Sequence, residues 1–224
     1  MTTPLRVAVL ASGRGSNLEA LRAAIDAGRC AAEVVAVLGD KAGAPALACA
    51  EAAGIATRAV PFRRAERAAW DEELAEAVAA AEPELVVLAG FMRLLGAPFL
   101  ARFGGRTINV HPSLLPAFPG MDAPAQTLAA GVRLSGCTVH LVDAGVDSGA
   151  ILAQAAVPVL PGDDVHTLHA RIQREEHDLL PAVVDAIARD LCRLEATGPR
   201  WTDAAWAGTS LAGFHSPTLG AGAG

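Results

Sequence analysis

The residues best suited to chemistry lie in the run Thr107-Ile108-Asn109-Val110-His111, which Pro112 closes. Side chains alternate across a β-strand, so Asn109 and His111 are predicted to point to the same side. An amide that donates to a developing oxyanion, beside an imidazole that carries a proton, suits acyl transfer. Asp147 would add a carboxylate that orients the imidazole and favours its protonated form.

The loop that follows this strand is rich in proline and glycine, with Pro116, Pro119 and Gly120 after Pro112. Such a composition is typical of a rigidly shaped loop that positions functional side chains. The alternative is that Asn109 caps a turn and that the histidine is an ordinary loop residue. A lone histidine would favour this alternative, whereas the dense prolines favour a functional loop.

A second candidate is the glycine-rich turn Ser12-Gly13-Arg14-Gly15-Ser16-Asn17, between an apolar strand at 6–11 and a helical pattern at 18–25. A turn of this kind exposes backbone N–H groups at the positive end of a helix, where phosphate binds. The spacing matches neither the dinucleotide fingerprint nor the P-loop. A plain strand-to-helix connection capped by Asn or Ser remains the alternative.

Composition limits the class of protein. The 224 residues are 52% hydrophobic and 19% charged, which is typical of a globular chain, and the net charge of -6 argues against nonspecific nucleic-acid binding. No apolar run is long enough to span a membrane, and the start Met-Thr-Thr-Pro-Leu-Arg lacks an apolar signal region. We therefore expect a cytoplasmic protein. Its four scattered cysteines are expected to be free thiols, and its histidines form no H-E-x-x-H zinc motif.

Strands and helices are predicted to alternate in the first half of the chain. The pattern indicates strands at 33–39, 55–60 and 85–89 and helices at 45–54 and 66–81, in addition to those named above. Alternation of this kind predicts an α/β fold with a doubly wound, mostly parallel sheet and helices on both faces. Ligands in such folds collect at the carboxyl ends of the strands. The glycine turn, the segment at 92–95 and His111 all follow such ends.

The second half is predicted to depart from this alternation. A short helix at 123–130 precedes strands at 136–142 and 150–157, which should pair antiparallel because their connection is short. Asp163 or Asp164 can cap a long helix, with a break or kink at Pro181. We expect one domain at 1–195 and a tail at 196–224, partly disordered at its end, with Trp201, Trp206 and Phe214 of unassigned role.

Three segments together carry a resemblance: Asn109-Val110-His111-Pro112-Ser113-Leu114-Leu115-Pro116, Asp143-Ala144-Gly145-Val146-Asp147-Ser148-Gly149 and Gly15-Ser16-Asn17. Over residues 6–193 the chain resembles the folate-dependent glycinamide ribonucleotide formyltransferases of purine synthesis. The resemblance implies the formyltransferase fold and transfer of a formyl group from 10-formyltetrahydrofolate to the amine of glycinamide ribonucleotide, without a metal. It also implies no nucleic-acid or membrane partner, and it leaves a monomer or a homodimer open.

The resemblance also assigns residues. Catalysis would fall to Asn109, His111 and Asp147, phosphate binding to Gly15, Ser16 and Asn17, and other ribonucleotide contacts to Gln173 and Glu176. Folate contacts would come from Arg67, Met92, Arg93, Leu94, Leu95, Asn109, Asp143, Ala144, Gly145, Val146 and Asp147. His140 is ranked as a structural or supporting residue. The chain departs from the family pattern at Met121-Asp122-Ala123-Pro124 and at Gly149-Ala150.

Other functions remain open from the sequence. A 10-formyltetrahydrofolate hydrolase would be expected to carry a further N-terminal regulatory domain, and a formyltransferase acting on aminoacyl-tRNA a basic C-terminal domain. A noncatalytic folate or nucleotide binder is the alternative outside enzymes. It is disfavoured because binding alone does not need a titrating imidazole.

Overall fold

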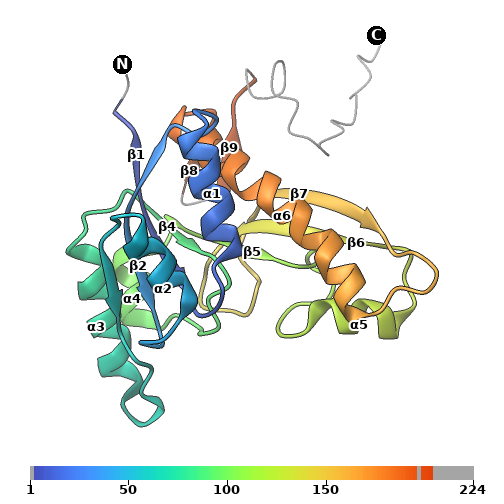
Figure 1. The fold of residues 1–224 in the computed structure, drawn as a ribbon, viewed down its shortest axis with the longest axis horizontal. Coiled ribbons are helices and arrows are strands. Elements are labelled where there is room, and N and C mark those ends of the chain that lie inside the picture. Colours follow the sequence, from blue (N-terminus) through green and yellow to red (C-terminus); the bar gives the residue numbers. More distant parts are fainter. Residues whose placement is uncertain (1–2, 196–197, 204–224) are drawn as a thin grey trace.

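A computed structural model describes residues 3–195 and 198–203 of the chain (Figure 1). The predictions for Trp206, Phe214 and the end of the tail lie outside the described residues. The first parallel strands and their helices are β1 (Leu5–Ala11), α1 (Ser16–Asp26), β2 (Ala32–Gly39), α2 (Pro45–Ala52), β3 (Thr57–Ala59), a 3-10 turn η1 (Arg64–Glu66), α3 (Arg67–Ala79), β4 (Leu85–Leu88), α4 (Ala97–Phe103) and β5 (Thr107–His111). The remaining elements are α5 (Ala123–Ala130), β6 (Leu134–Leu141), β7 (Ile151–Pro158), α6 (Val165–Ala188), β8 (Cys192–Glu195) and β9 (Gly198–Trp201).

Seven strands form one sheet in the order β3-β2-β1-β4-β5-β6-β7. The pairs from β3 to β5 are parallel, while β5–β6 and β6–β7 are antiparallel. The predicted doubly wound, mostly parallel sheet with an antiparallel strand pair is thus confirmed. Because β1 lies inside the sheet and β4 beside it, the strand order reverses next to the glycine turn. Crevices at such reversals are where ligands bind in open α/β sheets.

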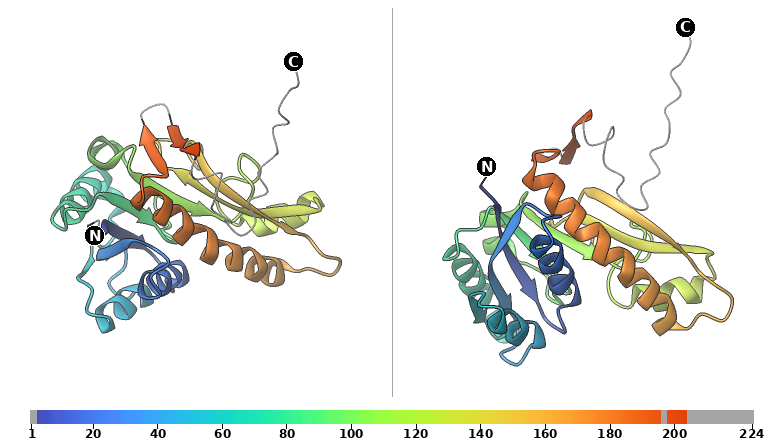
Figure 2. Two further views of the ribbon diagram at one scale, coloured as in Figure 1. Left: turned by 90° about the horizontal axis from the view of Figure 1, so that it is seen from above. Right: turned by 45° about the horizontal axis from the view of Figure 1, so that its top comes forward.

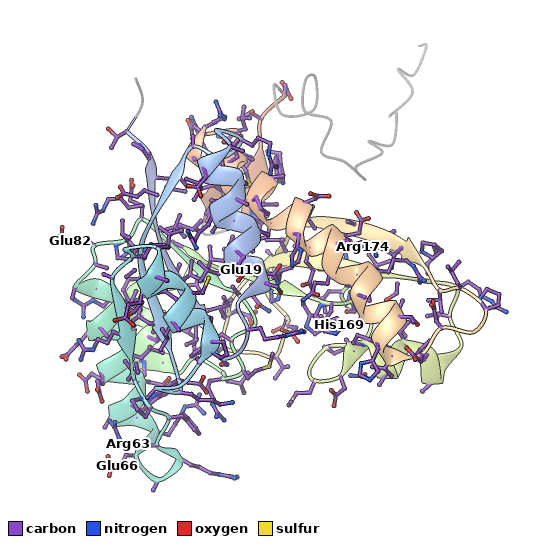
Figure 3. The ribbon with its side chains drawn as sticks, viewed as in Figure 1. Glu19, Arg63, Glu66, Glu82, His169 and Arg174 are labelled. Carbon is purple, nitrogen blue, oxygen red and sulfur yellow. The ribbon has the colours of Figure 1, made fainter. Side chains whose placement is uncertain are left out.

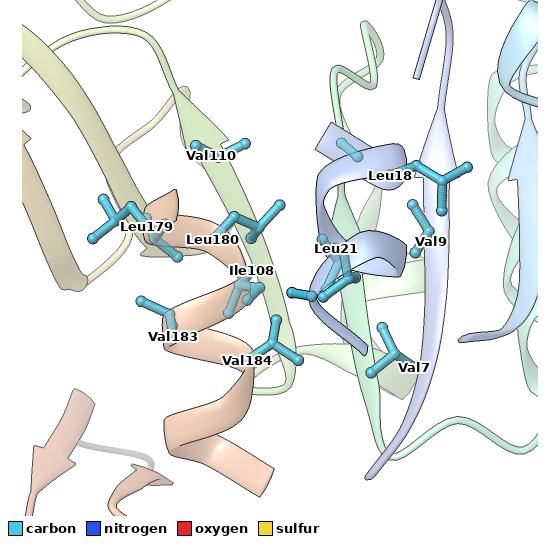
Figure 4. Close-up of a cluster of buried hydrophobic side chains, with 14 of the residues drawn as sticks. Val7, Val9, Leu18, Leu21, Ile108, Val110, Leu179, Leu180, Val183 and Val184 are labelled. Carbon is cyan, nitrogen blue, oxygen red and sulfur yellow. The ribbon is translucent and has the colours of Figure 1, made fainter. Parts of the chain in front are cut away.

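Helices cover both faces of the sheet, as Figure 2 shows from two further directions. Side chains of α1, α2 and α6 belong to one buried cluster, and those of α3 and α4 to the other. The figure places α6 along β6 and β7, beyond α1. Figure 4 shows Leu18 of α1 beside Val9 of β1, Leu180 of α6 beside Ile108 of β5, and Leu21 of α1 on the side toward Val184 of α6. This packing holds the first turn of α1 beside the middle of α6.

The helix α6 runs unbroken from Val165 to Ala188. The break predicted at Pro181 is therefore wrong, although proline removes one backbone donor from the helix. Leu179, Leu180 and Val183 are almost fully buried around it, and their packing offsets the lost hydrogen bond. The helix can thus carry functional residues along its whole first half.

A capping box begins α6. The Asp164 side chain accepts from the Thr167 backbone N–H at 2.8 Å, and the Thr167 hydroxyl oxygen accepts from the Asp164 N–H at 2.9 Å. We expect Asp164→Ala to lower the free energy of unfolding by about 1 kcal/mol, because one backbone N–H at the helix start loses its acceptor. Urea denaturation checks this, with Asp164→Asn as the control, since asparagine caps equally well. Equal losses in both variants would contradict the capping role.

The helix α4 and the β8–β9 hairpin are not among the predicted elements. β9 pairs with β8 across the expected domain boundary at residue 195, and the Trp201 indole N–H donates to the Leu152 carbonyl at 3.1 Å. Residues 198–201 therefore pack against the body of the molecule. Within residues 3–195 and 198–203, no helix combines the length and the apolar character that crossing a membrane requires.

Candidate active site

Asn109 and His111 lie on β5 with one residue between them, so their side chains lie on the same side of the strand, as predicted. β6 places His140 directly opposite Asn109 in the antiparallel register. The Asn109 Nδ2 lies 3.1 Å from His140 Nε2. An amide nitrogen can only donate, so His140 Nε2 accepts in this arrangement. The second hydrogen of the Asn109 amide is left for another acceptor.

The His140 imidazole is nearly fully buried and bonded at both nitrogens. Its Nδ1 lies 2.8 Å from the Leu141 carbonyl, which can only accept, so Nδ1 carries a hydrogen. With a free lone pair at Nε2 the ring accepts from Asn109. If Nε2 is protonated, it instead faces Asp147 Oδ1 at 3.6 Å. One edge of this imidazole is therefore shared by an amide donor and a carboxylate.

His111 lies at the end of β5, 5% exposed. Its Nδ1 is 3.3 Å from Asp147 Oδ2, and its Nε2 is 2.9 Å from the Phe118 carbonyl. Both nitrogens thus face acceptors, which is the arrangement that suits an imidazolium. The carbonyl belongs to the proline-rich loop, so this loop has to release Nε2 before the ring can reach a substrate.

Asp147 lies between the two imidazoles, on the loop that joins β6 and β7. Its backbone has a φ of 51°, in the left-handed region that Asp tolerates better than most residues. Oδ2 also accepts from the Gly120 N–H at 2.8 Å. One carboxylate therefore connects β5, β6 and the loop after Pro119. The three residues predicted to act together are indeed brought together.

The pKa of the Asp147 carboxyl is lowered. Burial alone would raise it, but the nearby His140, the hydrogen bond from the Gly120 N–H and the charge of His111 outweigh that effect. Asp147 is therefore an anion throughout the neutral range. It can orient and compensate a charged imidazole but cannot donate a proton there.

This lowered pKa makes the stability depend on pH. A carboxyl whose pKa is lower in the folded than in the unfolded state stabilises the fold above its unfolded pKa of about 3.9, and the contribution disappears as the pH falls through the folded value. We expect Asp147→Asn to lower the free energy of unfolding at pH 7, and the difference from the wild type to shrink as the pH falls below about 4. Denaturant unfolding at several pH values measures the difference. A difference that is constant with pH would contradict the lowered pKa.

A cavity of about 50 Å³, open to solvent, lies beside this cluster. Its lining residues are Leu88, Arg93, Leu94, Leu95, Asn109, His140, Val142, Asp143, Gly145 and Asp147. The lining thus combines apolar side chains with charged and polar ones. A cavity with this mixture suits an organic ligand that carries a few polar atoms.

Most residues predicted to contact folate line this cavity, whereas Arg67, Met92, Ala144 and Val146 do not. Met92 and Val146 are 61% and 50% exposed, and Ala144 is exposed on the same loop as Val146. The Met92 N–H donates to the Ser12 hydroxyl at 2.9 Å, which ties this segment to the glycine turn. These four residues lie outside the lining, and His111 is not part of it either.

Two arginines flank the Phe62 ring near the cavity. The Arg93 guanidinium lies 4.2 Å from the ring centroid, and Arg93 Nε donates to the fully buried Asp40 carboxylate at 2.6 Å. The Arg67 guanidinium lies 5.8 Å from the same centroid, and its Nε donates to Asp71 at 2.9 Å. Each cation is thus held in place by a buried carboxylate.

The glycine turn leads into α1, and Gly15 precedes the helix with a φ of 86°. A Cβ at this residue would lie 2.8 Å from the Ala46 side chain, so both the backbone angle and the close contact require glycine. α1 begins at Ser16, whose hydroxyl accepts from the Gln173 amide at 2.8 Å. The predicted phosphate-binding residues therefore lie at a helix start, in contact with α6.

Asn17 and Glu176 form the next contact between the two helices. The Asn17 Nδ2 donates to Glu176 Oε2 at 2.9 Å, and both side chains are more than nine-tenths buried. Burial raises the pKa of the Glu176 carboxyl, which the hydrogen bond from Asn17 opposes. Within the described residues, Asn17 Oδ1 is buried without a hydrogen-bond partner. This buried acceptor marks a place for a ligand donor.

His140, Leu88 and Val142 line the cavity but were not assigned to it from the sequence. Leu88 and Val142 end or follow buried strands, and apolar strand ends are a weak signal for ligand contact. For His140 the deciding fact is the register that places it opposite Asn109, on a strand 31 residues away in sequence. No local pattern in the sequence reveals that register.

Comparisons with known proteins agree with this geometry. Residues 5–184 match the protein family described as formyl transferase. The chain is 52% identical over 189 residues to phosphoribosylglycinamide formyltransferase of Mycobacterium tuberculosis H37Rv, covering 84% of this chain and 86% of that protein. It is 42% identical over 180 residues to the protein of the same name in Bacillus subtilis, covering 80% and 92%.

A solved structure is similar as well. The crystal structure of glycinamide ribonucleotide transformylase 1 from Symbiobacterium toebii superposes with a TM-score of 0.85 at 43% sequence identity. The match covers 91% of this chain and 96% of the other. The similarity in three dimensions thus extends over nearly all of both chains.

Proposed function

The chain belongs to the formyl transferase family, and on that premise we propose that it is a phosphoribosylglycinamide formyltransferase of purine synthesis. The reaction moves a formyl group from a reduced folate, which we propose to be 10-formyltetrahydrofolate, to the primary amine of glycinamide ribonucleotide. The observation that carries this proposal is the cluster of Asn109, His111 and Asp147 next to the cavity. A binding module has no need of an amide donor and a compensated imidazole in one place.

The proposed mechanism is direct attack of the amine on the formyl carbon. Charge then develops on the formyl oxygen of the tetrahedral intermediate, where the unpaired hydrogen of the Asn109 amide and the protonated His111 stabilise it. His111 moves a proton between the attacking amine and the departing folate nitrogen, and Asp147 orients and compensates it. Holding both substrates in line removes much of the entropic barrier, so no covalent intermediate is needed.

The substrates are proposed to approach from two sides of this cluster. The folate ring is proposed to occupy the cavity, with Arg93, Leu94 and Leu95 on one side and Asp143, Gly145 and Asp147 on the other. Arg67, Met92, Ala144 and Val146 are proposed to contact the part of the folate that extends beyond the cavity. The ribonucleotide phosphate binds at Gly15, Ser16 and Asn17, and its sugar reaches Gln173 and Glu176. The Ser12 contact to Met92 joins the two substrate sites.

A two-substrate assay tests the proposal. The purified chain is mixed with 10-formyltetrahydrofolate, and the loss of its formyl group is followed with and without glycinamide ribonucleotide. Loss that requires the ribonucleotide is the expected result. Loss without it would indicate a 10-formyltetrahydrofolate hydrolase, and no loss would overturn the proposal and direct the next assay to aminoacyl-tRNA acceptors and to simple binding.

Three further expectations stay proposals. We propose that the protein acts in the cytoplasm, which the free state of Cys30, Cys49, Cys137 and Cys192 supports, because reducing compartments keep thiols free. We propose a monomer or a homodimer, which sedimentation distinguishes. We also propose the division into a catalytic domain at 1–195 and a tail at 196–224, with the β8–β9 hairpin joining the two.

A further inference from the structure

The phosphate site of the proposed function needs a cation. A phosphate monoester carries about 1.5 to 2 negative charges near neutral pH. The start of α1 offers backbone N–H groups and a helix dipole equivalent to about half a positive charge. Glu176 adds a buried carboxyl, and the whole chain carries a net charge of -6. The positive charge must therefore come from nearby side chains.

Ser16 is already prepared for an anion by Gln173. Because its hydroxyl oxygen accepts from the Gln173 amide, the hydroxyl hydrogen remains free to be donated. Among the described residues no acceptor is found for this hydrogen, so a bound anion can accept it. Asn17 Oδ1, buried without a partner among the described residues, can accept from a donor group of the ribonucleotide but cannot bind its phosphate.

Arg14 and His169 come from the two segments that form this cradle, the turn before α1 and the helix α6. Arg14 immediately precedes Gly15 and is exposed, and within residues 3–195 and 198–203 it forms neither a hydrogen bond nor an ion pair. His169 lies one helical turn before Gln173 on the same face of α6. Figure 3 shows His169 on α6 and Glu19 on α1.

The charge of Arg14 acts on the His169 imidazole. Burial is the main cause that lowers the pKa of His169, and the charges of Arg14 and of His166 lower it further. No carboxylate acts on the imidazole to oppose them. An anion bound beside both groups would favour the charged imidazole, because it would oppose the effects of burial and of the Arg14 charge.

The nearby carboxylates are engaged elsewhere, which keeps the cradle positive. Asp163 forms an ion pair with Arg171 at 2.7 Å, and Asp164 caps α6. The charges of Glu19 and Asp178 act on His177, two turns further along α6. None of these groups therefore neutralises the pair at the start of α1.

We propose that Arg14 and His169 bind the phosphate of the ribonucleotide from opposite sides, and that phosphate binding is accompanied by protonation of His169. This inference rests on the proposed function for the identity of the ligand. It adds two charged ligands, from the turn before α1 and from α6, to the backbone donors at the helix start. The two side chains thereby select a phosphorylated substrate over its nucleoside.

The sign of the pH effect follows from the positions of the groups. A phosphate dianion beside His169 raises the pKa of the imidazole above its value in the free protein. The histidine thus strengthens binding fully at pH values below the free pKa, and the advantage is lost as the pH rises through the pKa of the complex. Phosphate itself loses a proton near pH 6, so only the difference between wild type and variant isolates the histidine.

Steady-state kinetics with two charge-removing variants test the proposal. We expect Arg14→Gln to raise KM for glycinamide ribonucleotide about tenfold with kcat little changed, as for the loss of one charge-assisted hydrogen bond. His169→Gln should raise KM several-fold at pH 6 and leave it near the wild-type value at pH 8.5. KM for the folate should stay the same in both variants.

Arg174→Gln is the matched control. It removes the same charge from α6, but Arg174 lies five residues beyond His169, about 140° further around the helix. Figure 3 shows both residues on α6. A KM for ribonucleotide within twofold of wild type is expected for this variant. The nucleoside that lacks the phosphate provides a second control, because its KM should be the same in all four proteins.

Inorganic phosphate gives a readout that does not depend on the reaction. It should raise the melting temperature of the wild type and of Arg174→Gln, and do so less for Arg14→Gln and His169→Gln. Equal protection together with unchanged ribonucleotide KM would overturn the inference while leaving the transferase assignment intact. Absence of transferase activity with a phosphate effect that depends on Arg14 would instead overturn the proposed function alone.

Discussion

The His111→Ala variant should lose about a thousandfold in kcat while it keeps the wild-type KM for both substrates. His111 is proposed to carry the proton between the amine and the folate nitrogen, and alanine removes that group without touching either substrate site. Its Nδ1 lies 3.3 Å from Asp147, so the variant also leaves this carboxylate without the charge that it compensates. Single-turnover formyl transfer measures the chemical step directly.

Two controls make this result interpretable. His111→Gln retains a hydrogen-bonding side chain but cannot carry a proton, so it should fall nearly as far as His111→Ala. Thermal unfolding of both variants establishes that the fold is intact, which is needed because the imidazole is 5% exposed. A glutamine variant with near-normal turnover would show that His111 holds the Phe118 loop and does not move protons.

Asn109→Ala should lower kcat by about two to three orders of magnitude, as expected when one donor to a developing oxyanion is removed. One hydrogen of the Asn109 amide is used by His140, and the other is available in the cavity. The ground-state formyl oxygen carries little charge, so KM for the folate should change far less than kcat. Parallel measurement of kcat and KM separates the two effects.

Asn109→Asp is the sharper version of this test. The side chain keeps its shape but donates no hydrogen bond and brings a second negative charge close to Asp147. Turnover should therefore fall at least as far as in the alanine variant. A rate in Asn109→Asp above that of Asn109→Ala would contradict the role of the amide as a donor to the oxyanion.

Several features of the molecule could be predicted from local sequence. Unbroken apolar runs such as Val7 to Leu10 are typical of strands buried on both faces, and these residues are fully buried in β1. The alternation of side chains places Asn109 and His111 on one side of β5 whatever the rest of the chain does. The glycine turn before α1 follows in the same way, because Gly15 requires a positive φ.

The long-range contacts of the site could not be predicted in this way. The register of β5 against β6 places His140 opposite Asn109. Asp147 can therefore contact both His111 and His140. Gln173 meets Ser16 across 157 residues of sequence. Such contacts depend on how segments distant in the chain pack, and the local sequence pattern of one segment does not identify the segment against which it packs.

The sequence by itself thus determined the kinds of element, the doubly wound order and the side chains able to do chemistry. The tertiary structure decided which nitrogens and oxygens face one another: His140 beside Asn109, the Phe118 carbonyl on His111 and the unbroken course of α6 past Pro181. The physical reason is that periodicity and turn chemistry act within a few residues. Register, helix packing and charge balance are set only when separate elements exclude water together.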